Sequence, residues 1–221
     1  MPSLAHRCAL RASRALFRPV GALAWGLRSS GGENVPASGG AILCANHVSL
    51  LDPIVLQAVV RRPVCYLMTS EFYYWRPIRW ASRLFEAIPV EPSGGGLASL
   101  LRAGRLLEQG DLLGIFPEGR VSRGAGLQAF RPGAALLALR HGVPLVPAWI
   151  HGTREALPRD ARLPRPSRIS VAIGDAIPVP RIGNDSVGNG DVAVLTERLR
   201  AAVASLEPPA AGGGGGASAA G

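Results

Sequence analysis

The chain has 221 residues, which is long enough for one domain with a sizeable core and short for two. Its 28 glycines and 19 prolines lie mostly between apolar runs, as in a loop-rich α/β protein. The formal net charge is +9, and every basic residue is an arginine. A basic surface indicates an anionic partner, namely nucleic acid, anionic lipid or a phosphorylated substrate. The low aromatic content and the absence of a recognition motif argue against nucleic acid. Three cysteines without metal-ligand spacing are interpreted as free thiols in a reducing compartment.

The first 30 residues combine a basic and an apolar helical face. Arginines spaced by four, three and four residues share one face, and leucines fall on the other. These arginines are Arg7, Arg11, Arg14 and Arg18. The pattern predicts an amphipathic helical segment, interrupted near Pro19, that lies on an anionic membrane surface. A helix packed on the domain and a cleaved mitochondrial-type presequence are the alternatives. We predict no transmembrane helix, because no apolar run reaches about 18 residues.

Short apolar runs and amphipathic segments alternate from residue 31 to residue 206, and they predict a single α/β domain. Strands are expected at 41–45, 64–69, 87–90, 112–116, 142–150 and 169–173. Helices are expected at 53–60, 97–109, 130–141 and 192–206. The expected sheet is mixed but mostly parallel, with helices flanking it. Prolines in the run at 142–150 predict an edge strand or irregular strand ends.

Three further segments are set apart by composition. Aromatic residues gather with arginines at 71–86, which is typical of a membrane interface or a lipid tunnel mouth, and equally of a helix docked on the core. Residues 154–168 are expected to form a basic, proline-interrupted surface loop. The Gly- and Ala-rich tail at 207–221 is predicted to be disordered.

A polar turn follows the first apolar run and holds His47 and Asp52, five residues apart. A carboxylate beside an imidazole fixes its tautomer and stabilises its protonated form, so this pair predicts a catalytic general base. Asn46 and Ser49 are expected to order the turn beside the substrate. The spacing also arises by chance, with Asp52 as a helix N-cap and His47 as a polar loop residue.

A second polar turn follows the run at 112–116, and it is rich in groups that bind polar substrates. Its candidate substrate-binding residues are Glu118, Gly119, Arg120, Ser122 and Arg123. Substrates of open α/β sheets bind at the carboxyl ends of strands, so the two turns are expected to form one site. The two arginines and nearby backbone N–H groups would hold a phosphate.

Four ordered blocks in this chain resemble the lysophospholipid acyltransferase family, typified by bacterial 1-acyl-glycerol-3-phosphate acyltransferase. Residues 46–52 match its NHxSxxD block and residues 116–123 its FPEGTRS block. Residues 87–90 and 143–147 lie where its second and fourth blocks occur. The chain departs from the family at Arg120 and Val121, where Thr and Arg are usual, and at Pro92, where an arginine is common. These departures leave the reaction intact and leave the acceptor open.

The resemblance implies transfer of an acyl chain from acyl-CoA or acyl carrier protein to a lysophospholipid hydroxyl, with 1-acylglycerol-3-phosphate as acceptor and no cofactor or metal. His47, oriented by Asp52, would be the base. N–H groups near His47 or Gly119 would bind the oxyanion. Glu118 would bind the acceptor head or pair with an arginine as a structural carboxylate. The enzyme is expected on the cytoplasmic face of the cell membrane, peripheral or monotopic. Another lysolipid or amino-lipid acceptor, a thioesterase and a non-catalytic membrane-binding protein are the alternatives.

Overall fold

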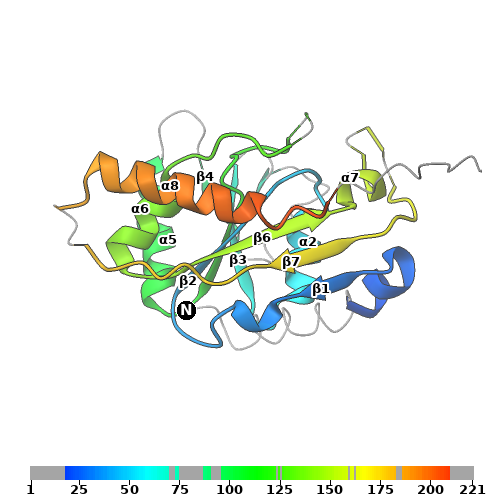
Figure 1. Ribbon diagram of the computed structural model, residues 1–221, viewed down its shortest axis with the longest axis horizontal. Helices are drawn as coiled ribbons and strands as arrows, with labels where there is room; N and C mark the ends of the chain where they lie inside the picture. Colours follow the sequence, from blue (N-terminus) through cyan, green and yellow to red (C-terminus); the bar gives the residue numbers. More distant parts are fainter. Residues whose placement is uncertain are drawn as a thin grey trace, which may run out of the picture.

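The computed structural model describes most of the predicted domain (Figure 1). The described residues are 18–69, 73–74, 87–90, 96–122, 124, 126–158, 160–161, 163–182 and 186–209. The predictions made for residues 1–17, for most of the aromatic segment, for residue 123 and for the end of the tail lie outside these residues.

Among the described residues, seven strands form one sheet in the order β1-β7-β6-β2-β5-β3-β4. The strands are β1 (Arg28–Ser30), β2 (Ala41–Ala45), β3 (Val64–Thr69), β4 (Ile88–Val90), β5 (Leu112–Ile115), β6 (Leu145–His151) and β7 (Ser170–Ile173). Neighbouring strands of this sheet pair in parallel, apart from the antiparallel pair of β6 and β7. The predicted mixed, mostly parallel sheet is confirmed.

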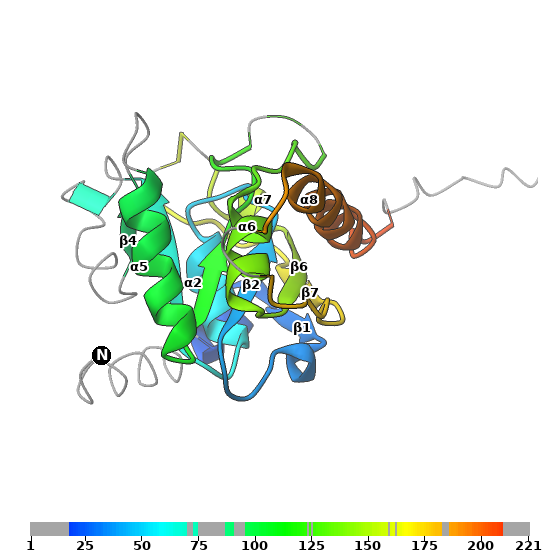
Figure 2. The ribbon, with the colours of Figure 1, turned by 90° about the vertical axis from the view of Figure 1, so that its left-hand side faces the viewer.

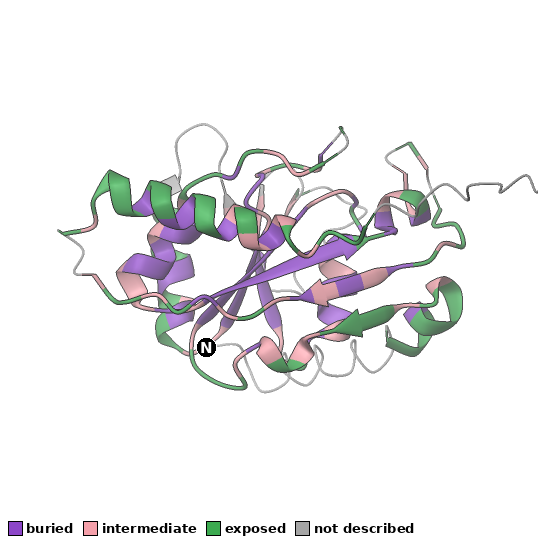
Figure 3. Ribbon diagram, viewed as in Figure 1, coloured by how far each residue is buried: buried purple, intermediate pink, exposed green. Residues whose placement is uncertain are grey.

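Helices cover both faces of the sheet (Figures 1 and 2). The helices are α2 (Asp52–Val59), α5 (Gly96–Glu108), α6 (Gly133–His141), α7 (Thr153–Ala156) and α8 (Asn189–Ala204), with a short 3₁₀ helix at Gly32–Asn34. Alternate side chains of β2 face opposite layers, because successive residues of a strand point to opposite faces. Ile42 joins the core cluster that contains α5, α6 and α8, and Leu43 joins the cluster that contains α2 and α7. Burial on both faces gives the continuous apolar runs seen in the sequence (Figure 3).

Strand β6 lies inside the sheet, between β7 and β2, so the edge position predicted from its prolines is wrong. Pro147 lies within β6 and pairs with Cys44 of β2, so it is not at an end of the strand, but it precedes the pairing of β6 with β7. The ladder to β7 begins one residue later, where Ala148 pairs with Ile173. The Pro147 carbonyl accepts the Gly174 N–H at 2.9 Å, so its missing N–H falls on the β7 side, just beyond that ladder.

The predicted N-terminal helical segment differs from the structure near its end. Residues 18–25 are helical, but Gly26 has φ +53° and ends the helix. Residues Arg28–Ser30 then pair in parallel with β7 as strand β1. The Trp25 indole donates to the Arg165 carbonyl at 3.0 Å and ties this segment to the loop before β7. None of the described helices is long and apolar enough to cross a membrane.

Candidate active site

His47 and Asp52 meet in the turn that joins β2 to α2. Nδ1 of the imidazole lies 2.9 Å from Oδ2 of the carboxylate, which is fully buried, while the histidine side chain is 16% exposed. An ionised carboxylate can only accept hydrogen bonds, so Nδ1–H is the donor. The lone pair of the neutral imidazole is then on Nε2, the atom that a general base presents to its substrate.

Asp52 holds the rest of the turn as well as the imidazole. Its Oδ2 accepts the backbone N–H groups of Val48 at 2.7 Å and Ser49 at 2.8 Å. Its Oδ1 accepts the Thr153 hydroxyl at 2.6 Å. Hydrogen bonds to an ionised acceptor are about twice as strong as neutral ones, so four of them compensate a carboxylate that is removed from water. Asp52 therefore organises the turn beyond the role of a simple helix cap.

The predicted partner turn, which follows β5, holds His47 from its other side. The imidazole stacks on Phe116, with ring centroids 4.1 Å apart and planes 18° apart. The His47 N–H donates to Oε1 of Glu118 at 2.8 Å, and the His47 carbonyl accepts the Ser122 N–H at 2.7 Å. The ring plane and both backbone groups of His47 are therefore set by residues 116–122.

Glu118 is buried, and its second oxygen accepts the Gln128 N–H at 3.4 Å. Burial raises the pKa of its carboxyl above the ordinary value, and these two N–H bonds oppose the shift only in part. Among the described residues, its partners are backbone N–H groups and no arginine pairs with it, while pairing with Arg123 lies outside these residues. Its role toward the acceptor stays a prediction, and the structure shows that it positions His47.

Asn46 and Ser49 are buried and serve the turn, as expected. The Asn46 side chain donates to the Ile150 carbonyl at 2.9 Å and accepts the Ile150 N–H at 2.7 Å. It thus continues the β2–β6 ladder with an amide group after the β2 backbone has turned away. The Ser49 hydroxyl donates to the Leu157 carbonyl at 3.0 Å. Direct contact of either side chain with a substrate stays a prediction.

The remaining predicted residues of the second turn lie in different environments. Gly119 has φ +72°, a backbone conformation that favours glycine, and a Cβ there would displace the Arg131 side chain, whose Nε would lie 2.4 Å away. Ser122 is buried and its hydroxyl lies 3.5 Å from the Gly124 carbonyl. Arg120 is exposed. Arg123 lies outside the described residues.

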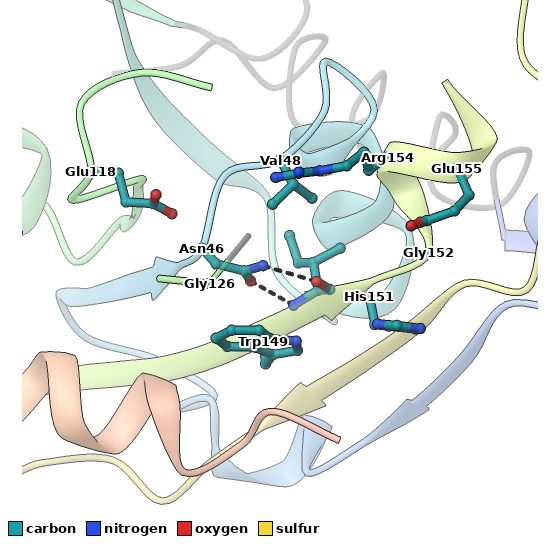
Figure 4. Close-up of a pocket in the computed structure, with 10 residues that line it drawn as sticks. Asn46, Val48, Glu118, Gly126, Trp149, His151, Gly152, Arg154 and Glu155 are labelled. Atoms are coloured by element: carbon teal, nitrogen blue, oxygen red, sulfur yellow. Dashed lines mark hydrogen bonds between the residues drawn. The ribbon is translucent and has the colours of Figure 1, made fainter. Parts of the chain in front are cut away.

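A pocket of about 170 Å³ opens at the carboxyl ends of β2 and β6 (Figure 4). Its wall includes Asn46, Val48, Glu118, Trp149, His151, Arg154 and Glu155. Of the arginines that the structure describes, Arg154 is the one in this wall. Its guanidinium donates to the carbonyls of Gly124 at 2.8 Å and Ser122 at 3.3 Å, so it spans from α7 to the second turn.

Sequence reasoning did not find Thr153, Arg154 and Phe116. The first two follow β6 directly, and residues 154–168 were assigned to a surface loop. The rule that placed the other turns at the carboxyl ends of strands applies equally to residues 151–154. Phe116 was counted as a strand residue, although it directly precedes the second polar turn.

The N–H groups expected to bind an oxyanion already have acceptors. Those of His47, Val48 and Ser49 donate to the Glu118 and Asp52 carboxylates, and the Gly119 N–H donates to the Phe116 carbonyl at 2.9 Å. These four N–H groups are therefore not available to an oxyanion, and a role for other N–H groups near Gly119 stays a prediction. Within the described part of the chain, no group of three His, Cys, Asp or Glu side chains could hold a metal ion.

A buried His–Asp pair at the carboxyl edge of a mostly parallel sheet has the geometry of a general-base site. Comparison with known proteins identifies the family. The profile of the Acyltransferase family matches residues 26–151, more than half of the chain, so the chain belongs to this family. The resemblance noted from the sequence is confirmed.

Similar proteins include 1-acyl-sn-glycerol-3-phosphate acyltransferases of two bacteria. The chain is 30% identical to that of Bacillus subtilis over 122 residues, which are 54% of this chain and 60% of the relative. It is 25% identical to that of Borreliella burgdorferi over 126 residues, 56% of this chain and 50% of the relative. The chain thus matches half to three fifths of the length of these relatives.

The crystal structure of the acyltransferase PlsC from Thermotoga maritima has the same fold. It superposes with a TM-score of 0.73 at 19% identity and covers 91% of this chain and 80% of the other. The α/β fold predicted from the sequence is confirmed by this likeness.

Proposed function

We propose that the chain is an O-acyltransferase that transfers a fatty acyl chain from a thioester to the hydroxyl of a lysophospholipid. The observation that carries this proposal is the His47–Asp52 pair, whose Nδ1–Oδ2 bond leaves Nε2 as the basic atom at the carboxyl edge of the sheet. Family membership and the named relatives support 1-acylglycerol-3-phosphate as the acceptor, with phosphatidic acid as the product.

The residues support a direct transfer in one site. Nε2 of His47 takes the proton of the acceptor hydroxyl while the hydroxyl oxygen attacks the thioester carbonyl. Asp52 stabilises the imidazolium through Nδ1–H, and general-base action of this kind contributes about 10²- to 10⁴-fold. The tetrahedral intermediate then collapses, the C–S bond breaks, and the imidazolium proton passes to the leaving thiolate. No covalent acyl-enzyme, metal or cofactor is required.

Charge and exposure support a membrane-borne acceptor. The donor is acyl-CoA or acyl carrier protein, and the acceptor lies in a membrane surface. A net charge of +9 supports attraction to anionic lipid. Leu50, 40% exposed in the same turn as His47, supports contact with an apolar phase. We place the protein on the cytoplasmic face of the cell membrane, as a peripheral or monotopic protein.

Thiol release from acyl-CoA, measured with and without 1-acylglycerol-3-phosphate, tests the proposal. We expect release that requires the acceptor and is abolished in His47→Ala, which retains the fold and liposome binding. His141→Ala is the matched control, because this histidine at the end of α6 also lies beside a carboxylate, with Nδ1 3.4 Å from Oε1 of Glu108, and does not line the pocket. Release without acceptor would indicate a thioesterase. Retained transfer in His47→Ala would contradict the mechanism, and a panel of lysolipid acceptors identifies the preferred head group.

A further inference from the structure

We propose that Thr153 is a positioning residue of this site, which fixes the Asp52 carboxylate so that Oδ2 faces the imidazole of His47. This role rests on the proposed acyl transfer. Thr153 lies outside both polar turns, about a hundred residues along the chain from the pair that it would hold.

The contact between the two side chains is short and completely buried. Oγ1 of Thr153 lies 2.6 Å from Oδ1 of Asp52, and both residues have no exposed surface. The hydroxyl must be the donor, because an ionised carboxylate only accepts. A donor on Oδ1 is needed for orientation, because the three other described donors to this carboxylate all converge on Oδ2. The Thr153 bond therefore determines the plane in which the carboxylate lies.

The backbone conformation before Thr153 brings its hydroxyl to Asp52. Strand β6 ends at His151, and Gly152 turns the backbone with φ +86°. A Cβ at Gly152 would lie 1.9 Å from the Arg168 carbonyl oxygen, so only glycine fits there. Thr153 then begins α7 directly above Asp52. Because threonine is branched at Cβ, its χ1 angle is restricted and its hydroxyl direction is well defined.

A second bond joins the same short helix to the same turn. The carbonyl of Leu157, at the end of α7, accepts the Ser49 hydroxyl at 3.0 Å, and the Leu157 N–H donates to the Thr153 carbonyl at 2.9 Å. Both ends of α7 thus hold the catalytic turn, one through Asp52 and one through Ser49. Loss of the Thr153 hydroxyl would leave Ser49 to keep α7 in place, so the effect on Asp52 can be separated from movement of the helix.

Loss of the Thr153 hydroxyl would affect the proposed reaction only through Asp52 and His47. Without the Thr153 hydroxyl, the carboxylate can rotate and Oδ2 no longer points steadily at Nδ1. The charge on the carboxylate is also less neutralised, which favours the imidazolium form of His47. The other described titratable or charged groups around the pair are Glu118 from the second turn, Tyr66 from β3, and His151, Arg154 and Glu155 next to Thr153; the substitution replaces none of them. The weaker bond to Nδ1 disfavours the imidazolium and the less neutralised charge favours it, so the acidic limb of the pH–rate profile should move, in the direction of the larger effect.

The test compares Thr153→Val, which keeps the shape and removes the hydroxyl, with Thr153→Ser, which keeps the hydroxyl. We expect Thr153→Val to lower kcat about 10- to 100-fold, the range for loss of one hydrogen bond to a charged group, with KM for both substrates unchanged. Thr153→Ser should recover most of kcat and the wild-type pH profile. If the valine variant does not fold, Thr153→Ala takes its place in the comparison.

Thr196→Val is the matched control. Thr196 is also buried, and its hydroxyl donates at 2.7 Å to the Val192 carbonyl within α8, away from the site. This control should keep the wild-type kcat. Wild-type kcat and pH profile in Thr153→Val would overturn the proposal, and so would a serine variant as slow as the valine variant.

A second measurement separates this proposal from the proposed function. Carbethoxylation of neutral imidazole by diethyl pyrocarbonate, followed at His47 by peptide mass spectrometry across pH, requires no acyl transfer. We expect its pH midpoint to shift in Thr153→Val, in the same direction as the acidic limb of the pH–rate profile, and to return in Thr153→Ser. If the wild-type protein transfers no acyl group, the proposed function fails and this midpoint still decides the link from Thr153 to His47.

Discussion

Replacement of Asn46 by alanine should lower stability more than any ordinary loss of a polar side chain. The Asn46 amide satisfies both the N–H and the carbonyl of Ile150, and Asn46 and Ile150 are 3% and 1% exposed. Asn46→Ala would leave the N–H and the carbonyl of Ile150 in β6 without these partners. Each unpaired buried group costs about 1–3 kcal/mol. Because both residues line the pocket, water can reach one of the groups, so we expect about 2–4 kcal/mol in total.

Urea unfolding followed by circular dichroism measures this loss. With an m-value of about 2–3 kcal/mol per M, the unfolding midpoint should fall by about 1 M without a change in m. Asn34→Ala is the matched control, because the Asn34 amide donates one bond of 3.1 Å to the Ile173 carbonyl and is only partly buried. It should cost about 1 kcal/mol. The reasoning is refuted if Asn46→Ala unfolds at the wild-type midpoint, or if it costs no more than Asn34→Ala.

Two further predictions concern the second turn. Burial raises the pKa of Glu118 in the folded protein above its value in the unfolded chain, so between these two values folding is accompanied by proton uptake. The contribution of this carboxyl to stability is therefore full below the unfolded-state pKa and is lost as pH rises through the folded-state pKa. In Glu118→Gln, the stability relative to wild type should therefore increase with pH across that window, measured by urea unfolding at several pH values; a constant difference would contradict it. Arg120→Ala and Arg123→Ala should mainly raise KM for a phosphorylated acceptor in steady-state kinetics. If neither does, the phosphate binds elsewhere, and Arg154 in the pocket wall is the next arginine to replace.

Much of the fold could be predicted because the strands are buried on both faces. Their apolar runs are continuous and separated by turn residues, so the predicted helix at 97–109 and strand at 112–116 match α5 and β5 within a residue. The interior position of β6 could not be predicted from its prolines. A proline is tolerated inside this sheet because the pairing of β6 with β7 begins only at Ala148, one residue after Pro147, and the sequence does not show where that pairing begins.

The site was predictable where its chemistry is local in sequence. His47 and Asp52 are five residues apart, and the structure brings them into contact. Thr153 reaches Asp52 only because β6 is the neighbour of β2, and strand order is a tertiary property that spacing does not encode. Glu118 was predictable as a site residue for the same local reason. Its bond to the His47 N–H depends on the pairing of β5 with β2 and could not be predicted.

Strand order also explains how the catalytic turn is supported. The turn follows β2, which lies between β6 and β5, and each neighbour ends in groups that hold it. From the β5 side, Phe116 stacks on the imidazole and Glu118 accepts the His47 N–H. From the β6 side, Ile150 pairs with Asn46 and Thr153 donates to Asp52. Because the turn is held on both sides, the His47 side chain keeps only a small exposed surface. In the proposed reaction, an acceptor hydroxyl would approach Nε2 through that opening, and the fixed base would supply the alignment on which proximity catalysis depends.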